Sequence, residues 1–85
     1  MYKIKFTDKA SKALRKLDNS IQRKIISYLD QSSLLQNPKS FGKPLLHDKK
    51  GSWRYRVGDY RIICQIIDRE LVILTLDIGH RKEIY

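Results

Sequence analysis

The stretch GSWRYRVGDYRIICQIID, residues 51–68, decides the fold. Aromatic and aliphatic residues alternate with arginine in WRYRV, aliphatic residues fill YRIICQIID, and the GD dipeptide between them is typical of a two-residue hairpin turn. With that turn, Arg56 lies directly opposite Arg61, and side-chain parity puts Arg54 on the same face. The stretch therefore predicts an antiparallel hairpin with three arginines on one side and the aromatic side chains on the other.

Like charges that face each other across a sheet are destabilising, so this arginine face needs an explanation. One interpretation is a solvated face whose arginines pair with carboxylates such as Asp59, Asp77 or Glu83. The other is a surface for an anion. Lysine is absent from residues 53–80, although the outward helix positions are mostly lysine. Because the planar guanidinium suits bidentate contact with phosphate, the choice of arginine favours the second interpretation.

The remaining segments predict one opening strand, two helices and a third antiparallel strand. Residues 2–6 alternate as in a half-buried strand, and residues 8–18 and 21–32 carry apolar positions at helical spacing. Residues 36–44 hold both prolines and one glycine and predict a loop. LVILTLDI, residues 71–78, follows a short polar turn and predicts the last strand of a meander.

The resulting order is β-α-α-β-β-β. It predicts an α+β fold in which an antiparallel sheet packs against an N-terminal helical hairpin. At 85 residues the chain is long enough for one domain, residues 1–85, with no room for a second.

The charge balance points to a polyanionic partner. Eighteen Lys and Arg stand against nine Asp and Glu, which gives a formal net charge of +9 and a pI near 9.9. Nucleic acid is the first expectation, an acidic protein the second and an anionic membrane surface the last.

Trp53 is interpreted as a core residue rather than a base-stacking platform.

Two further features concern compartment. The single cysteine, Cys64, lies in an apolar run and is expected to be a buried hydrophobic residue, since one cysteine cannot form an internal disulfide. The start MYKIKFTDKA lacks the apolar core of a signal peptide, and no apolar run is long enough for a membrane span. A cytoplasmic protein without a membrane partner is expected.

Three stretches resemble the RelE branch of the RelE/ParE toxin superfamily, the toxins of type II toxin–antitoxin modules. They are KIKFTDKASKALRKLD, WRYRVGDYRIICQIID and VILTLDIGHRKEIY, which together span most of the chain. The most specific part is a tyrosine–arginine pair in the hairpin, followed about twenty residues later by glycine, a basic residue and arginine, with a tyrosine near the end.

The resemblance implies a toxin that enters the ribosomal A site and cleaves mRNA there, with no metal and no other cofactor. Arg54 and Arg56 match two basic positions of the family, Arg61 matches an arginine that stabilises the charged transition state, and Arg81 and Tyr85 match the arginine after the glycine and the catalytic tyrosine. These five residues are the catalytic candidates.

Cleavage of RNA without a metal is chemically reasonable because the 2′-hydroxyl is an internal nucleophile, already placed near the phosphorus. Arginine cannot act as a general acid or base near neutral pH, so these arginines are expected to do electrostatic and positioning work. Tyr85 is the expected base, because neighbouring guanidiniums favour its phenolate. If the tail is extended, Arg81 and Tyr85 share one face and His80, a reserve acid or base, lies on the other.

A second set of basic residues is expected to contact RNA outside the reacting centre. The set is Lys43, His47, Lys49, Lys50, His80 and Lys82. For the first four of these, a solvated loop stays an open alternative. Lysines of the first helix are expected to steer the protein toward RNA, and by the same charge toward an acidic antitoxin.

The expected partners follow from the resemblance: mRNA, the 70S ribosome with its 16S rRNA, and a cognate acidic antitoxin whose complex with the toxin binds operator DNA through the antitoxin. Two alternatives stay open. One is a ParE-like toxin that inhibits DNA gyrase and does not cut RNA, and the other is a basic RNA-binding module without activity.

Overall fold

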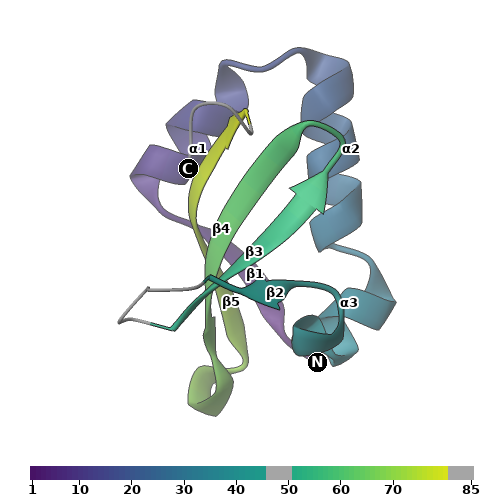
Figure 1. The fold of residues 1–85 in the computed structure, drawn as a ribbon, viewed down its shortest axis with the longest axis vertical. Helices are drawn as coiled ribbons and strands as arrows, with labels where there is room; N and C mark the ends of the chain where they lie inside the picture. The colour runs from purple at the N-terminus through teal and green to yellow at the C-terminus, as the bar shows by residue number, and fades with distance from the viewer. Residues whose placement is uncertain (46–50, 81–85) are drawn as a thin grey trace.

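A five-stranded sheet packed against helices is the frame of the protein in its computed structural model, which describes residues 1–45 and 51–80 (Figure 1). The α+β class and the predicted order of the main elements are confirmed. In chain order the elements are β1 (Lys3–Phe6), α1 (Asp8–Arg15), α2 (Asn19–Leu29), α3 (Ser32–Gln36), the 3₁₀ turn η1 (Pro38–Ser40), β2 (Lys43–Pro44), β3 (Ser52–Val57), β4 (Tyr60–Ile67), the 3₁₀ turn η2 (Asp68–Glu70) and β5 (Val72–His80).

The β3–β4 hairpin is the one the sequence predicts. Its register places Val57 opposite Tyr60 and Arg56 opposite Arg61. Gly58 has a φ of 59°, and Asp59 has a negative φ, the combination that a type II′ turn takes with glycine first. The central strands β3, β4 and β5 form the expected antiparallel meander.

The opening strand differs from the expectation of a wholly antiparallel sheet. The strand order is β1-β5-β4-β3-β2, and β1 runs parallel to β5, with Lys3 beside Val72 and Phe6 beside Thr75. A parallel neighbour needs a long crossover, and α1, α2 and the rest of the sheet separate these two strands in sequence. The antiparallel prediction is therefore corrected at this edge.

A bulge changes the parity of β5 near its end. Cys64 pairs with Thr75, but Ile63 pairs with Asp77, so Leu76 is an extra residue on β5. The shift places Gly79 opposite Arg61, where a residue without a side chain leaves the arginine room.

Helices α1 and α2 cover one face of the sheet (Figure 1). The Thr7 hydroxyl accepts a hydrogen bond from the Ala10 N–H at 3.1 Å and thereby caps the start of α1. Apolar side chains of both helices meet those of β3, β4 and β5 in a single core. Its buried members are Leu14, Ile25, Leu29, Leu34, Leu35, Tyr55, Ile62, Cys64, Ile73 and Ile78.

The predicted loop at residues 36–44 is more ordered than expected. The second helix ends at Leu29, a separate short helix α3 follows, and the prolines belong to η1 and β2. Pro38 stands at the first position of η1, where its missing N–H costs nothing. The proline and glycine content of residues 36–44 correctly predicted that the helices end here. It did not predict that β2, within this segment, joins the sheet as an edge strand.

At the end of the sheet away from the hairpin turn, a polar contact joins three segments. The Tyr2 hydroxyl donates to Asp68 Oδ1 at 2.6 Å, and Lys39 Nζ lies 3.0 Å from Asp68 Oδ2. The contact therefore ties η1, which leads into β2, to the turn between β4 and β5. We call these three residues the Asp68 clasp.

Candidate phosphate-binding pocket

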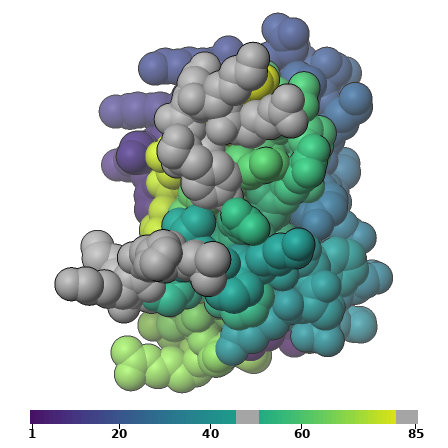
Figure 2. Space-filling view, viewed as in Figure 1, coloured from purple at the N-terminus to yellow at the C-terminus, as the bar shows by residue number. Residues whose placement is uncertain are grey.

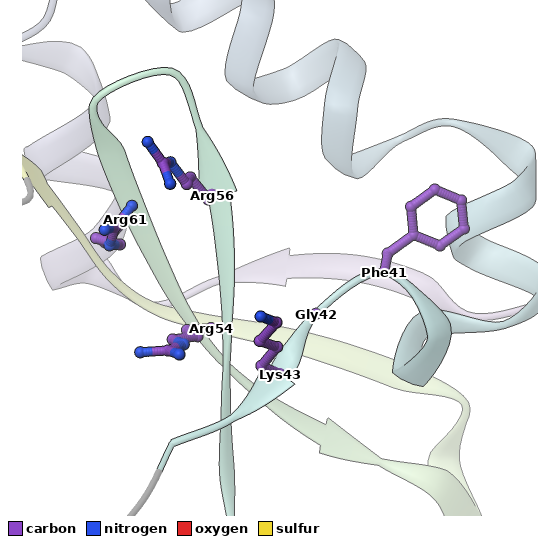
Figure 3. Close-up of a pocket in the computed structure, with 6 residues that line it drawn as sticks. All are labelled: Phe41, Gly42, Lys43, Arg54, Arg56 and Arg61. Atoms are coloured by element: carbon purple, nitrogen blue, oxygen red, sulfur yellow. The ribbon is translucent and has the colours of Figure 1, made fainter.

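The arginine face forms one side of a shallow pocket of about 190 Å³ (Figure 3). Viewed as in Figure 1, the teal and green segments that include β2, β3 and β4 contribute to the surface that faces the viewer (Figure 2). Six residues line the pocket: Phe41, Gly42, Lys43, Arg54, Arg56 and Arg61. Four of the six carry a positive charge, so the pocket has the charge that binding of an anion requires.

The β-strand geometry brings these cations together. Arg54 and Arg56 are two residues apart on β3, and Arg61 lies opposite Arg56 on β4, so all three point to the side of the sheet away from the core. Lys43 pairs with Arg54 from β2. Arg54 and Arg61 are partly buried, Arg56 is exposed, and Arg56 Nε donates to the Gly58 carbonyl at 3.4 Å. A phosphate in this pocket would meet guanidinium groups from two strands and an ammonium from a third.

The wall opposite the arginines is held by a close contact between η1–β2 and β3. The buried Tyr55 hydroxyl donates to the Pro38 carbonyl at 2.8 Å, which fixes η1 against the sheet. A Cβ at Gly42 would lie 2.7 Å from the Arg54 carbonyl oxygen and 3.0 Å from the Tyr55 ring. Only glycine lets the chain pass this close to β3, so Gly42 sets the width of the pocket.

The buried groups behind the pocket do not ionise readily. Burial raises the pKa of the Cys64 thiol to about 12, and it raises the pKa of Tyr55 well above its ordinary value. The prediction that Cys64 is a buried hydrophobic residue is confirmed. Neither side chain can serve as a base near neutral pH.

The structure separates His80 from the arginine face. His80 pairs with Tyr60 across β4 and β5, and the two rings make an edge-to-face contact with centroids 5.6 Å apart. Both line a hollow of about 350 Å³ beside α1, together with Lys16 and Leu17. His80 is therefore on the helix side of the sheet, as the alternation predicts, and any RNA contact that it makes lies outside the arginine pocket.

Of the predicted site residues, the structure brings Arg54, Arg56, Arg61 and Lys43 into one pocket. Six others, namely His47, Lys49, Lys50, Arg81, Lys82 and Tyr85, lie outside the described residues.

Sequence reasoning missed Phe41 and Gly42. Trp53, the aromatic residue that it considered, is partly buried and has the opposite parity to Arg54. Gly42 itself is the signal that could have indicated this wall of the pocket. It lies between an aromatic residue and a lysine in a segment with two prolines, and an isolated glycine often marks a close approach of two backbones.

Two features of the described residues bear on other kinds of site. None of the helices in residues 1–45 and 51–80 combines the length and the apolar character needed to span a bilayer. Within the same ranges, no three His, Cys, Asp or Glu side chains are grouped as metal ligands. Action without a metal stays a prediction.

Known proteins are similar to this chain in sequence and in fold. The family model described as "ParE toxin of type II toxin-antitoxin system, parDE" matches residues 4–85. Toxin RelG of Mycobacterium tuberculosis is 31% identical over 84 residues, which cover 99% of this chain and 95% of that protein. The toxin–antitoxin complex RelBE2 of the same organism contains a chain that is 30% identical with a TM-score of 0.84, covering 94% of this chain and 98% of the other. The intact RelBE complex of E. coli shares the fold, with a TM-score of 0.77, 21% identity and 94% and 96% coverage.

Fold and sequence thus define a toxin of the RelE/ParE superfamily. The chain belongs to the ParE toxin family of type II toxin–antitoxin systems, and its similarity to RelG and to the RelE-type structures places it in the RelE-like branch.

Proposed function

We propose that this protein is a ribosome-dependent endoribonuclease that cleaves mRNA in the ribosomal A site, without a metal, and thereby stops translation. The observation that carries the proposal is the pocket in which Arg54, Arg56, Arg61 and Lys43 converge. A pocket of about 190 Å³ with four cations suits a phosphate group of a single strand better than a flat duplex backbone.

In this proposal the reaction is an attack of the 2′-hydroxyl on the adjacent phosphorus, which breaks the bond to the 5′-oxygen of the next nucleotide. The proton of the 2′-hydroxyl goes to a base, and the leaving oxygen gains a proton. Arg54, Arg56 and Arg61 stabilise the extra negative charge on the non-bridging oxygens, where one well-placed donor is worth about 3 to 4 kcal/mol.

The proposed base is Tyr85, which the resemblance assigns and which lies outside the described residues. The arginines cannot take this role because their guanidiniums stay protonated. Tyr55 is also excluded, since burial raises its pKa and its hydroxyl is already bound to the Pro38 carbonyl.

The proposed inhibitor is an acidic antitoxin that masks the arginine pocket in the cytoplasm, and the toxin–antitoxin complex would reach operator DNA through the antitoxin. Support comes from the net charge of +9 and from relatives that were solved as complexes with a RelB-type partner. A protein partner that neutralises the pocket would block phosphate entry directly.

A second candidate is inhibition of DNA gyrase, because the matching family model describes a ParE toxin. Primer extension on a defined mRNA bound to programmed ribosomes separates the two. The nuclease proposal expects new 3′ ends within the A-site codon and none without ribosomes. If the protein makes no cuts and the same preparation inhibits supercoiling by gyrase, the nuclease proposal is wrong and gyrase inhibition becomes the favoured function.

A further inference from the structure

Tyr55 lies on the core side of β3, yet it contacts the segment that forms one wall of the arginine pocket. Along β3, Tyr55 stands between Arg54 and Arg56, and strand alternation places its ring on the opposite face from their guanidiniums. The side chain is only 1% exposed. Any influence of Tyr55 on a ligand in the pocket therefore acts through the backbone.

Tyr55 contacts the segment from η1 to β2 at both of its ends. Its hydroxyl donates to the Pro38 carbonyl at 2.8 Å inside the core. The same carbonyl accepts a hydrogen bond from the Phe41 N–H at 3.4 Å, so one oxygen joins Tyr55 to the turn of η1. At the other end, a Cβ on Gly42 would lie 3.0 Å from the Tyr55 ring. One side chain of β3 thus holds the chain on either side of residues 39–41.

Lys43 is the residue that this anchoring places in the pocket (Figure 3). It pairs with Arg54 across β2 and β3, and paired residues of antiparallel strands share a face, so its side chain lies on the side of the guanidiniums. β2 has two residues, and the second is Pro44, which has no N–H to donate to β3. Because so short an edge strand makes few ladder bonds, its position depends on the anchor at η1.

We propose that Tyr55 is a positioning residue: its hydroxyl, through the Pro38 carbonyl, holds Lys43 where the ammonium and the arginine guanidiniums bind one RNA phosphate. This inference rests on the proposed function and adds to it a residue that acts on the pocket from the core.

The alternative is that Tyr55 only stabilises the fold, because a buried tyrosine hydroxyl needs a hydrogen-bond partner in any case. The two roles differ in one respect. If Tyr55 is a positioning residue, removing its hydroxyl weakens binding through Lys43, and the loss disappears when Lys43 is absent.

The test is a double-mutant cycle between Tyr55→Phe and Lys43→Ala. Phenylalanine keeps the buried ring and removes only the hydroxyl. Fluorescence anisotropy measures binding of a short single-stranded RNA over a range of salt concentrations, with one 2′-deoxy nucleotide at the cleavage position so that the RNA stays intact. Tyr28→Phe is the matched control, because the Tyr28 ring packs edge to face on Tyr55, with centroids 6.3 Å apart, and loses the same group.

We expect Lys43→Ala to weaken binding about tenfold and to lower the slope of log Kd against log salt by about 0.7, the contribution of one phosphate of a single strand. Tyr55→Phe should weaken binding about fivefold in the wild-type background and less than about twofold in Lys43→Ala, and it should lower the salt slope only in the former. Tyr28→Phe should stay within about twofold of wild type. Thermal melting should show every variant folded, with Tyr55→Phe lower by about 8 °C at most.

The inference is overturned if Tyr55→Phe binds like wild type, if its loss persists in full in Lys43→Ala, or if Lys43→Ala leaves the salt slope unchanged. It is also overturned if the wild type does not bind the RNA, or if Tyr55→Phe does not fold, which would make the hydroxyl a structural group. Coupling between Tyr55 and Lys43 without cleavage on ribosomes would instead contradict the proposed function and leave the positioning role intact.

Discussion

Arg56 lies directly opposite Arg61 across the β3–β4 hairpin, and both side chains face away from the core. Like charges directly opposite each other in a sheet repel, so this pair carries a repulsive contribution. In the function that we propose, the phosphate of a bound mRNA adds negative charge beside the pair.

We therefore expect Arg61→Ala to keep the fold, with a free energy of unfolding equal to that of wild type or higher by a few tenths of a kcal/mol. Urea unfolding followed by circular dichroism measures the change. A loss of more than about 2 kcal/mol would show that Arg61 is a structural residue.

Gly42→Ala should distort the pocket by forcing the backbone around residue 42 away from β3. The new methyl group would sit 2.7 Å from the Arg54 carbonyl oxygen, and a β3 backbone held between β2 and β4 cannot move away cheaply. We expect a loss of about 1 to 3 kcal/mol in unfolding free energy and weaker RNA binding.

Ser40→Ala in the same segment is the control for Gly42→Ala. It removes one exposed hydrogen bond, to the Asn37 carbonyl, and should cost about 1 kcal/mol or less. Equal effects of the two substitutions would contradict the close-approach role of Gly42.

The Asp68 clasp should make stability depend on pH. Hydrogen bonds from Tyr2 and Lys39 hold the pKa of Asp68 below its ordinary value. Because the folded value is the lower one, the stabilisation is present above the ordinary pKa of about 4 and is lost as pH falls through the folded value. The pKa of Tyr2 is raised by the same hydrogen bond, so its contribution is lost as pH rises through the folded value.

Thermal melting of wild type and Asp68→Asn between pH 2 and pH 8 checks this. Wild type should melt higher at neutral pH, and the two curves should converge in acid. Asp59→Asn, which removes an exposed carboxylate at the hairpin turn, controls for net charge. A gap that stays constant with pH would rule out the clasp as its source.

Tyr85→Phe tests the proposed base. Removing the phenol should slow single-turnover cleavage on ribosomes by about a hundredfold or more, since general base catalysis contributes about 10² to 10⁴. A rate within about twofold of wild type would show that another group takes the proton.

Much of this architecture is readable from local pattern. The GD turn and the alternation around it fix which residues face each other, so the opposition of Arg56 and Arg61 follows from sequence alone. The capping role of Thr7 is similarly local.

Other features depend on contacts between distant segments and could not be read in this way. The parallel pairing of β1 with β5 joins strands from opposite ends of the described chain, and the bulge at Leu76 is a mismatch in register between β4 and β5. Gly42 lines the pocket because only a residue without a Cβ can approach β3 this closely. Such a contact leaves little trace in one sequence beyond an unexplained glycine.

The most direct test of the central claim is the single-turnover rate of mRNA cleavage on programmed ribosomes for wild type, Arg61→Ala and Arg69→Ala. Arg69 is exposed in η2, outside the pocket, so its removal matches the change in net charge. We predict A-site cleavage by wild type, a loss on the order of a hundredfold or more for Arg61→Ala, and a rate within about twofold of wild type for Arg69→Ala. Equal rates for all three proteins, or no cleavage by any of them, would contradict the account.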